Sequence, residues 1–187
     1  GRRNSEYIIP YIVANGTALE SARFPRGRVG AAGGYSNPTE NAVKFFGMKN
    51  GMAITASGSG YNPSNPYANR DPRFNYSIIY NQAPIWRSGS GTTLVPIDIF
   101  FNKATNSLTA DGIQTYYTKT GYYSGKMAND STATSASINR AYPVLRLAEL
   151  YLGYAEALNE IGQTEQAVTW LNKIRKRAGI DAGTESR

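Results

Sequence analysis

Two segments that are expected to be loops carry the residue types that could bind a ligand non-covalently. They combine aromatic rings with amide or guanidinium groups: Tyr61, Tyr67 and Asn65, with Asn62 and Asn69 beside them, and Trp86 next to Arg87. Aromatic rings stack on the apolar C–H faces of sugar rings, and amide or guanidinium groups hydrogen-bond the hydroxyls at the rim. The combination predicts non-covalent binding of a sugar-like ligand. The alternative is that these rings pack locally in small cores.

Carboxylate catalysis is a second chemistry that the sequence allows. A glycosidase needs two carboxyl groups facing each other about 5 to 10 Å apart across a cleft. The candidates are Asp71, Asp98, Asp111 and Asp130, and none of them lies in a recognisable acid or nucleophile motif. The chain has no His and no Cys, which excludes disulfides, thiolate or imidazole metal sites, and Ser-His or Cys-His nucleophiles. We therefore expect no catalytic residue, no metal site and no cofactor.

Charged and glycine-rich segments have plainer interpretations. Asp71 between Arg70 and Arg73 could grip a ligand, but the pattern favours a network of ion pairs that pins a loop. The segment 27–35 and Gly125-Lys126 depart from dinucleotide and P-loop spacing, so no phosphate cradle is predicted.

The net charge of +7 comes from 20 basic and 13 acidic residues, and the basic residues are spread along the chain. Their one cluster, Lys173 to Arg177, is typical of a solvated helix C-terminus, so nucleic acid is not an expected partner. No apolar run approaches the roughly 20 residues of a membrane span, and no signal peptide or lipobox opens the sequence.

The elements that must position the candidate residues are clearest at the end of the chain. Apolar residues recur at helical spacing in two stripes: Val144, Leu147, Ala148, Tyr151, Ala155 and Leu158, then Ala167, Val168, Leu171 and Ile174. Gly162 and Gly179 stand where each helix should end. The short link predicts an antiparallel hairpin that matches a tetratricopeptide repeat in several positions. Because roughly three such repeats are needed to bury their stripes, we expect this hairpin to have neighbours.

The rest of the chain is expected to be rich in loops. A short helix is predicted near 38–46, capped by Asn37 with Glu40. Alternating or apolar runs predict strands at 6–14, 74–80 and 94–101, while 55–69 and 131–137 read as loop and linker. The sequence therefore predicts one domain, 1–187, with a loop-rich part, 1–138, and a helical hairpin, 139–179. Its class is mainly α with a few short strands.

Several motifs in a fixed order resemble the SusD/RagB family. They are NPTENAVKFFGMKNG, NRDPRFNYSIIY, TKTGYYSGK, and PVLRLAELYLGYAEALNE followed by LNKIRKRAG, spread over residues 37–179. The resemblance implies a tetratricopeptide scaffold with a loop-rich subdomain packed on it. It also implies a cell-surface lipoprotein of the outer membrane that binds glycans without catalysis and passes them to a SusC-like TonB-dependent transporter.

The resemblance also limits what can be carried over to single residues. The family's lipidated N-terminal Cys, earlier helical repeats and C-terminal segment do not occur in these 187 residues, so it implies a piece of a longer protein whose membrane contact is a lipid anchor outside this chain. Glycan contacts vary between family members, so no binding residue transfers by motif. Arg146, Glu149 and Glu156 match the family pattern and are expected to be structural. A tetratricopeptide-type scaffold for protein interaction is the remaining alternative function.

Overall fold

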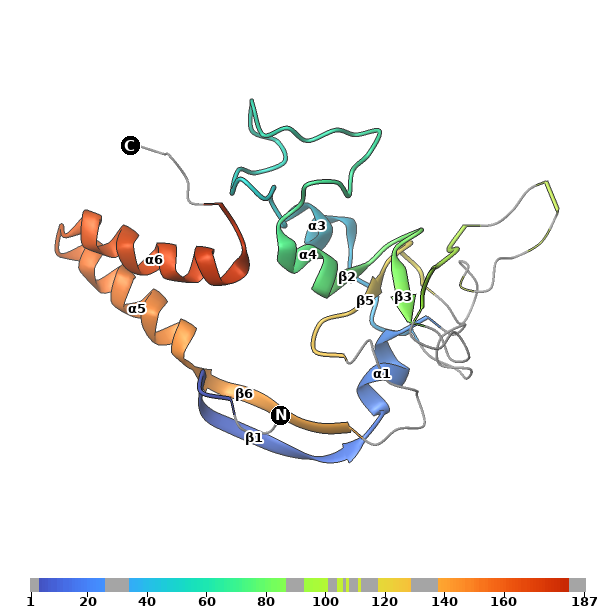
Figure 1. The fold of residues 1–187 in the computed structure, drawn as a ribbon, viewed down its shortest axis with the longest axis horizontal. Helices are drawn as coiled ribbons and strands as arrows, with labels where there is room; N and C mark the ends of the chain where they lie inside the picture. The colour runs from blue at the N-terminus through green and yellow to red at the C-terminus, as the bar shows by residue number, and fades with distance from the viewer. Residues whose placement is uncertain are drawn as a thin grey trace. The chain divides into compact units, whose positions relative to one another are not determined.

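The structure is a computed structural model that describes residues 4–25, 34–86, 93–100, 104–105, 107, 111, 118–128 and 138–181. The chain forms two compact units, coloured by residue number in Figure 1. The first unit contains residues 1–15, 46–72 and 139–187, and the second contains residues 16–45 and 73–138. Each unit is described by itself. The division expected from sequence, at residue 138, stays a prediction.

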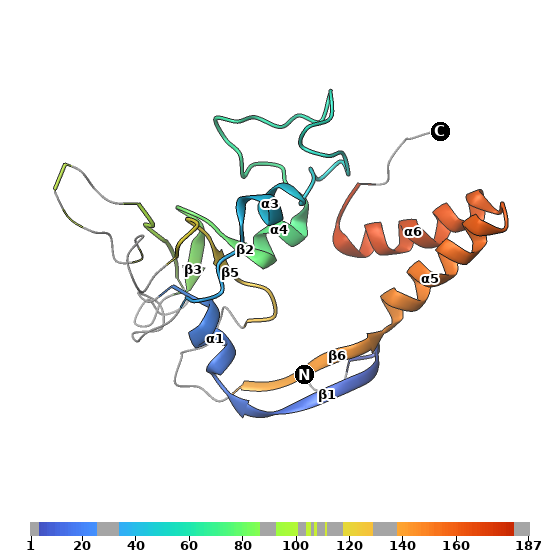
Figure 2. The same cartoon turned by 180° about the vertical axis from the view of Figure 1, so that it is seen from behind.

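A long two-stranded ribbon pairs the start of the chain with the segment that precedes the helical hairpin. Strand β1 (Tyr7–Gly16) pairs with strand β6 (Ile138–Arg146), and the two lie side by side in Figures 1 and 2. The first strand was expected. The second corrects the expectation that the helical hairpin begins at residue 139. Pairing with β1 holds residues 138–146 extended, and the N–H of Leu147 donates to the Glu6 carbonyl at 2.9 Å where the strand gives way to helix.

Two antiparallel helices follow, as predicted. Helix α5 (Leu147–Glu160) and helix α6 (Thr164–Ala178) pack closely against each other. Both end as the glycines predicted. At the end of α5 the N–H of Gln163 donates to the Leu158 carbonyl, and at the end of α6 Gly179 is left-handed and the N–H of Ile180 donates to the Arg175 carbonyl. The larger tetratricopeptide scaffold stays a prediction.

The core of the hairpin is small, and its outer faces are apolar. Ala155, Leu158 and Ala167 are buried between the helices, and Trp170 packs against them. The ring of Trp170 contacts Tyr151 and Tyr154 at centroid distances of 4.9 and 5.1 Å. Side chains that the apolar stripes pointed to remain exposed, together with others on the same two helices: Leu150, Leu152, Tyr154, Ile161, Val168 and Leu171. The hairpin thus presents apolar surface beyond what its own contact buries.

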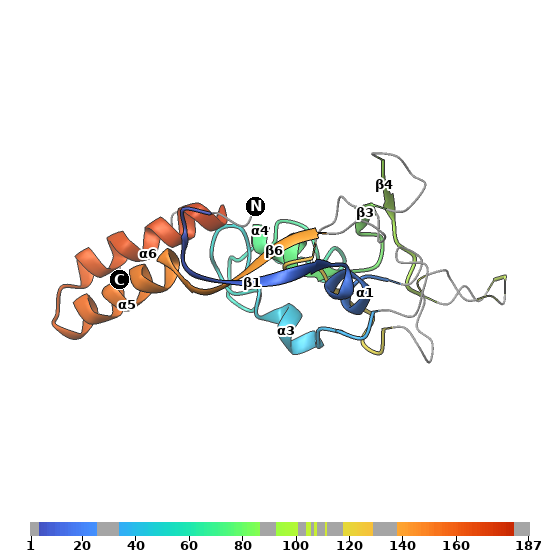
Figure 3. The same ribbon diagram turned by 90° about the horizontal axis from the view of Figure 1, so that it is seen from below.

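The second unit has its own core around short strands. Buried residues Phe24, Ile79, Ala83, Ile85, Ile97, Ile99 and Tyr123 form it. They come from the segment that follows helix α1 (Ala18–Arg23), from strand β2 (Ile78–Ile79), from strand β3 (Pro84–Trp86), and from strands β4 (Leu94–Pro96) and β5 (Tyr123–Ser124) or residues next to them. β2 pairs with β5, and β3 pairs with β4, both antiparallel. β2 and β5 are labelled in Figure 1, and β3 and β4 in Figure 3. Tyr123 is fully buried, with its hydroxyl donating to the Asp111 carbonyl, so this tyrosine is a core residue.

Residues 72–77 correct a prediction. The alternation of Phe74, Tyr76, Ile78 and Tyr80 predicted a strand, but residues 72–77 form helix α4 (Pro72–Ser77), and only Ile78 and Ile79 are strand. The burial pattern explains why, since Phe74 and Ile78 are buried four residues apart while Tyr76 between them is 77% exposed. Pro72 also fits the first helical position, where its missing N–H costs nothing.

The other short helix was predicted nearly correctly. Helix α3 (Glu40–Lys44) is capped by Thr39, whose hydroxyl accepts from the N–H of Ala42 at 3.3 Å. Asn37, the predicted cap, instead bridges other main-chain groups: its amide donates to the Gly34 and Tyr122 carbonyls and accepts from the Lys119 N–H. Val43 is buried as expected.

An ion pair joins the start of the chain to helix α6. Nε of Arg177 donates to Oε1 of Glu6 at 2.6 Å and Nη2 donates to Oε2, which makes the contact bidentate. The hydrogen bonds from Arg177 lower the pKa of the Glu6 carboxyl. Slight burial acts in the opposite direction, and the charges of Arg177 and Arg146 add to the lowering.

We expect Glu6→Gln to reduce the free energy of unfolding by about 0.2 to 1 kcal/mol at neutral pH, the usual range for an exposed pair. Because the folded-state pKa of Glu6 is depressed, its contribution is fully present above the unfolded-state pKa, about 4.3, and is lost as the pH falls through the folded-state value. Denaturant titrations at neutral pH and at about pH 3 should show the difference between variant and parent shrinking in acid. Glu160→Gln, an exposed change on α5, is the control. A Glu6→Gln difference that does not change with pH would contradict the assignment.

Candidate functional site

Residues 47–71 form a loop whose two ends meet. Met48 and Arg70 form an isolated antiparallel bridge, the N–H of Lys49 donates to the Asn69 carbonyl at 2.8 Å, and the N–H of Asp71 donates to the Gly47 carbonyl at 2.9 Å. Long loops in compact domains, when their ends are held together in this way, frequently carry function. Tyr61, Asn65 and Tyr67, three of the predicted binding residues, lie in it.

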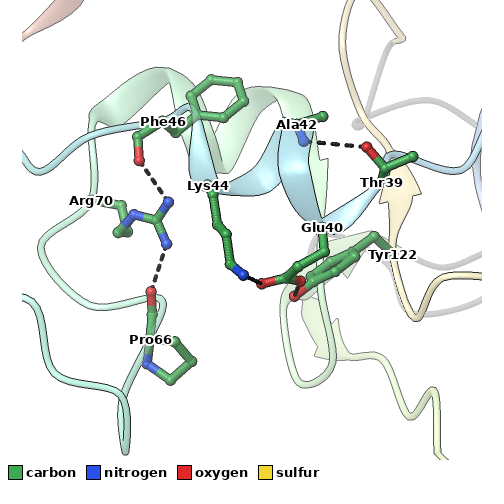
Figure 4. A network of polar contacts seen from close by, with 8 residues as sticks. All are labelled: Thr39, Glu40, Ala42, Lys44, Phe46, Pro66, Arg70 and Tyr122. Carbon is green, nitrogen blue, oxygen red and sulfur yellow. Dashed lines mark hydrogen bonds and ion pairs between the residues drawn. The ribbon is translucent and has the colours of Figure 1, made fainter. Parts of the chain in front are cut away.

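The guanidinium of Arg70 holds the loop from inside. Its side chain is only 4% exposed, and it donates to three main-chain carbonyls: Nη2 to Phe46 at 2.7 Å, Nη1 to Pro66 at 2.8 Å and Nε to Gly47 at 3.4 Å. Figure 4 shows the first two of these contacts. The carbonyls belong to both limbs of the loop, so a single planar group fixes their separation. The structural interpretation of the Arg70–Arg73 cluster is therefore favoured, and the contacts that pin the loop include these main-chain carbonyls.

Short-range hydrogen bonds order the tip of the loop. The hydroxyl of Ser59 donates to the Ile54 carbonyl at 3.4 Å and accepts from the N–H of Tyr61 at 3.3 Å, while the Asn50 amide donates to the Ser59 carbonyl at 3.2 Å. Further on, the Asn62 side chain accepts from Ser64, and the N–H of Asn65 donates to the Asn62 carbonyl. The composition that predicted an irregular loop thus builds a series of linked turns.

Tyr61, Asn65 and Tyr67 are presented differently by this frame. Asn65 is exposed, whereas Tyr61 and Tyr67 are half-buried. The Tyr61 ring lies against the anchor, with the guanidinium carbon of Arg70 5.8 Å from the ring centroid. A half-buried ring backed by a fixed group is held in one orientation and keeps part of its surface open to solvent.

Trp86 and Arg87, the other predicted binding residues, belong to the second unit. The main chain of Trp86 ends β3, paired opposite Leu94. Its side chain and the whole of Arg87 lie outside the residues that the structure describes. The structure thus groups three of the five candidates in one loop and leaves these two as predictions.

Helix α6 supports the base of the loop, a role that sequence reasoning missed. Nη2 of Arg175 donates to the Asp181 carbonyl at 2.9 Å, and the N–H of Asp181 donates to the Lys49 carbonyl at 2.9 Å. A Cβ placed on Gly51, whose φ is +85°, would overlap the Arg175 guanidinium. The sequence shows that α6 ends in a cluster of basic residues before Gly179. It does not indicate that this end of the helix contacts the base of the loop 47–71.

Of the carboxylates proposed for a catalytic pair, Asp71 belongs to the first unit, and Asp98 and Asp111 belong to the second. Asp71 and Asp111 are buried, at 3% and 0% exposure, while Asp98 is exposed and Asp130 lies outside the described residues. Within the described part of the chain no three His, Cys, Asp or Glu side chains gather in a group that could hold a metal ion.

A separate polar network occupies the second unit. The Tyr122 hydroxyl donates to Oε2 of Glu40 at 2.8 Å, and Lys44 lies one helical turn along α3 with its Nζ 3.8 Å from Oε1 (Figure 4). These groups fix the segment 118–122 against α3. Both ends of the ion pair are more than half exposed, so it adds little stability.

The arrangement of helices, ribbon and loop matches known structures. A SusD-like protein from Bacteroides fragilis is similar over 100% of this chain and 38% of its own length, with a TM-score of 0.65 and 22% identity. A structure solved as BT4246 is similar over 95% of this chain and 34% of its own, with a TM-score of 0.66 and 20% identity. This chain therefore spans little more than a third of either relative, and the likeness establishes the fold, a mixed helical one of SusD-like type.

Comparison of the sequence with family models identifies the family. The model of the SusD family matches residues 13–187, and the chain belongs to that family. Proteins of this family bind glycans in nutrient uptake, work with SusC-like transporters and are typically surface lipoproteins of the outer membrane. No curated protein sequence matches the chain. Among the described residues, no helix combines the length and the apolar composition needed to cross a membrane.

We expect Arg70→Lys to loosen the loop, because an ammonium cannot reproduce the fork that serves three carbonyls. Leaving buried carbonyls unpaired should reduce the free energy of unfolding by about 1 to 3 kcal/mol. Amide hydrogen exchange should become faster across residues 54–69 and remain unchanged in the α5–α6 hairpin. Lys126→Arg, the reverse exchange at an exposed position, should affect neither measurement. Unchanged exchange in the loop of Arg70→Lys would show that the guanidinium is not its anchor.

We further expect Gly51→Ala to cost more stability than Gly58→Ala. Both glycines have positive φ, +85° and +76°, so both changes carry the same type of backbone strain. Only at Gly51 would the new methyl also displace Arg175 from Asp181, adding about 1 kcal/mol, since Gly58 has no atom within 4 Å of the new Cβ. Denaturation of each variant, alone and combined with Arg175→Ala, forms a double-mutant cycle. A gap that persists without Arg175 would contradict the contact.

Proposed function

We propose that this chain is the part of a SusD-family protein that binds an oligosaccharide without catalysis, through the loop 47–71. The observation that carries the proposal is the loop itself, in which Tyr61, Tyr67 and Asn65 stand on a frame held by the buried Arg70. Family membership supports a glycan as the ligand class. Trp86 and Arg87 remain proposed contributors from the second unit.

The proposed mechanism is capture by a surface that needs little ordering. The rings of Tyr61 and Tyr67 supply apolar area for the C–H face of a sugar, and the exposed Asn65 amide supplies a donor and an acceptor for hydroxyls. Because the loop is already closed and internally hydrogen-bonded, binding costs less conformational entropy than it would in a mobile segment. Each sugar hydroxyl exchanges a hydrogen bond to water for one to an amide, and the net gain in binding free energy is small. Most of the affinity therefore comes from the apolar area that stacks on the rings.

We also propose that the longer protein delivers the glycan to a SusC-like TonB-dependent transporter and sits on the outer membrane through a lipid anchor. Family membership supports both statements. The exposed apolar side chains of α5 and α6 favour an additional structural role for the hairpin, in which it packs against other protein. This observation also keeps a protein-interaction scaffold as the second candidate function.

Substitution of the loop aromatics tests the proposal. We expect Tyr61→Ala and Tyr67→Ala each to weaken binding by about 1 to 3 kcal/mol, the usual value of a buried aromatic contact, with a smaller loss for Asn65→Ala. Calorimetric titration against a panel of polysaccharide fragments gives the affinities, and the same mixtures are assayed for reducing sugar. Trp86→Ala tests the second unit in the same way.

Tyr76→Ala is the matched control, because Tyr76 is a tyrosine 77% exposed on α4 and packs against little. Glycan binding that survives all three loop substitutions would overturn the site. Release of reducing sugar would instead favour the glycosidase. Absence of glycan binding together with capture of a peptide by the α5–α6 hairpin would favour the scaffold.

A further inference from the structure

Within the loop 47–71, the stretch 50–69 contains no charged side chain. From residue 50 to residue 69 the sequence has neither Asp, Glu, Lys nor Arg, although the whole chain carries 33 such residues, 20 basic and 13 acidic. The exposed polar side chains of this stretch are amides and hydroxyls: Asn50, Thr55, Ser57, Asn62, Ser64, Asn65 and Asn69.

The charges around this stretch are engaged elsewhere, apart from that of Lys49. The Arg175 guanidinium lies against Gly51, but its Nη2 donates to the Asp181 carbonyl. Arg70 is 4% exposed and its guanidinium donates to three carbonyls, so it cannot also serve a ligand. Asp71 is 3% exposed. Lys49 is exposed, but its main chain pairs with Asn69 at the base of the loop, on the opposite side of the loop from its tip.

We propose that the loop 50–69 selects a neutral oligosaccharide and binds it without ion pairing. This inference rests on the proposed function and specifies its substrate class. A carboxylate or sulfate on the sugar would have to give up hydration at a surface where the guanidinium groups of Arg70 and Arg175 already donate to main-chain carbonyls, which is unfavourable. A neutral sugar needs only the stacking area and the amide and hydroxyl partners that the loop supplies.

Salt dependence separates this binding from attraction to the chain as a whole. A net charge of +7 draws any polyanion toward the protein at low ionic strength. Such attraction is screened as salt rises, whereas stacking and neutral hydrogen bonds are not. The dissociation constant of a neutral fragment should therefore change less than about twofold between about 50 mM and about 500 mM NaCl.

The experiment uses pairs of probes that share a backbone and differ only in charge. Oligogalacturonate is compared with its methyl ester, and carboxymethylated with unmodified cello-oligosaccharide, alongside malto-, xylo- and manno-oligosaccharides. Calorimetry at both salt concentrations should show binding of at least one neutral member, with its charged counterpart weaker by about tenfold or more at high salt. Binding only of charged members, lost at high salt, would overturn the inference and leave glycan binding in place. Binding of no member would overturn the proposed function itself.

A pair of charge-adding variants locates the effect in the loop. Asn65→Lys puts an ammonium among the proposed contacts, and Gln166→Lys puts the same charge on α6, nine residues or about 13 Å along the helix from Arg175, which supports the loop base. Asn65→Lys should improve binding of the charged member of a pair severalfold at low salt, and Gln166→Lys should not. Equal effects of the two variants would show that residue 65 is not at the contact surface and would overturn the assignment to this loop.

Discussion

The geometry of the candidate site depends on one buried cation. Arg70 bonds Phe46 and Gly47 on one limb of the loop and Pro66 on the other, so the loop cannot open without leaving carbonyls unpaired in a buried place. A lysine at this position would keep the positive charge but lose the planar set of N–H donors, and a neutral side chain would lose both. These three hydrogen bonds of the Arg70 guanidinium go to main-chain carbonyls of the loop. Because these bonds keep the guanidinium buried, its positive charge does not lie on the loop surface.

The helical hairpin extends that constraint outward. Arg175 and Asp181 link the C-terminal end of α6 to Lys49 and Gly51 at the loop base. Through Glu6 and Arg177 the same helix also holds the start of the β1–β6 ribbon. A short loop rich in Asn, Ser and Gly has few apolar contacts of its own, so its order comes from hydrogen bonds and from this helix. The α5–α6 hairpin and the loop 47–71 therefore differ in composition and are joined by a few polar contacts.

How far the sequence predicts this structure follows from the range of the interactions involved. Helix α6 and the ends of both long helices were predictable, because helical spacing and a glycine at the right place are local signals. The start of α5 was misplaced because Pro143 and Val144 extend into a strand whose partner lies about 130 residues earlier in the chain, and no local pattern reports that pairing. At residues 74–77 alternation competed with the helix-starting Pro72, and packing of Phe74 decided in favour of helix.

At the candidate site, too, the sequence predicted which residue types take part but not which of them are buried. Residue types identified Tyr61, Asn65 and Tyr67 as binding candidates, because a stretch of amides and tyrosines is recognisable in sequence. The anchor was not predictable as such, because Arg70, Asp71 and Arg73 look alike in charge and only burial distinguishes the frame residue Arg70 from the exposed Arg73. Burial also determines which charged side chains contribute to the charge of the loop surface. The chain as a whole carries a net charge of +7, but the stretch 50–69 of the loop carries no charged side chain, so net charge is a poor guide to what this stretch binds.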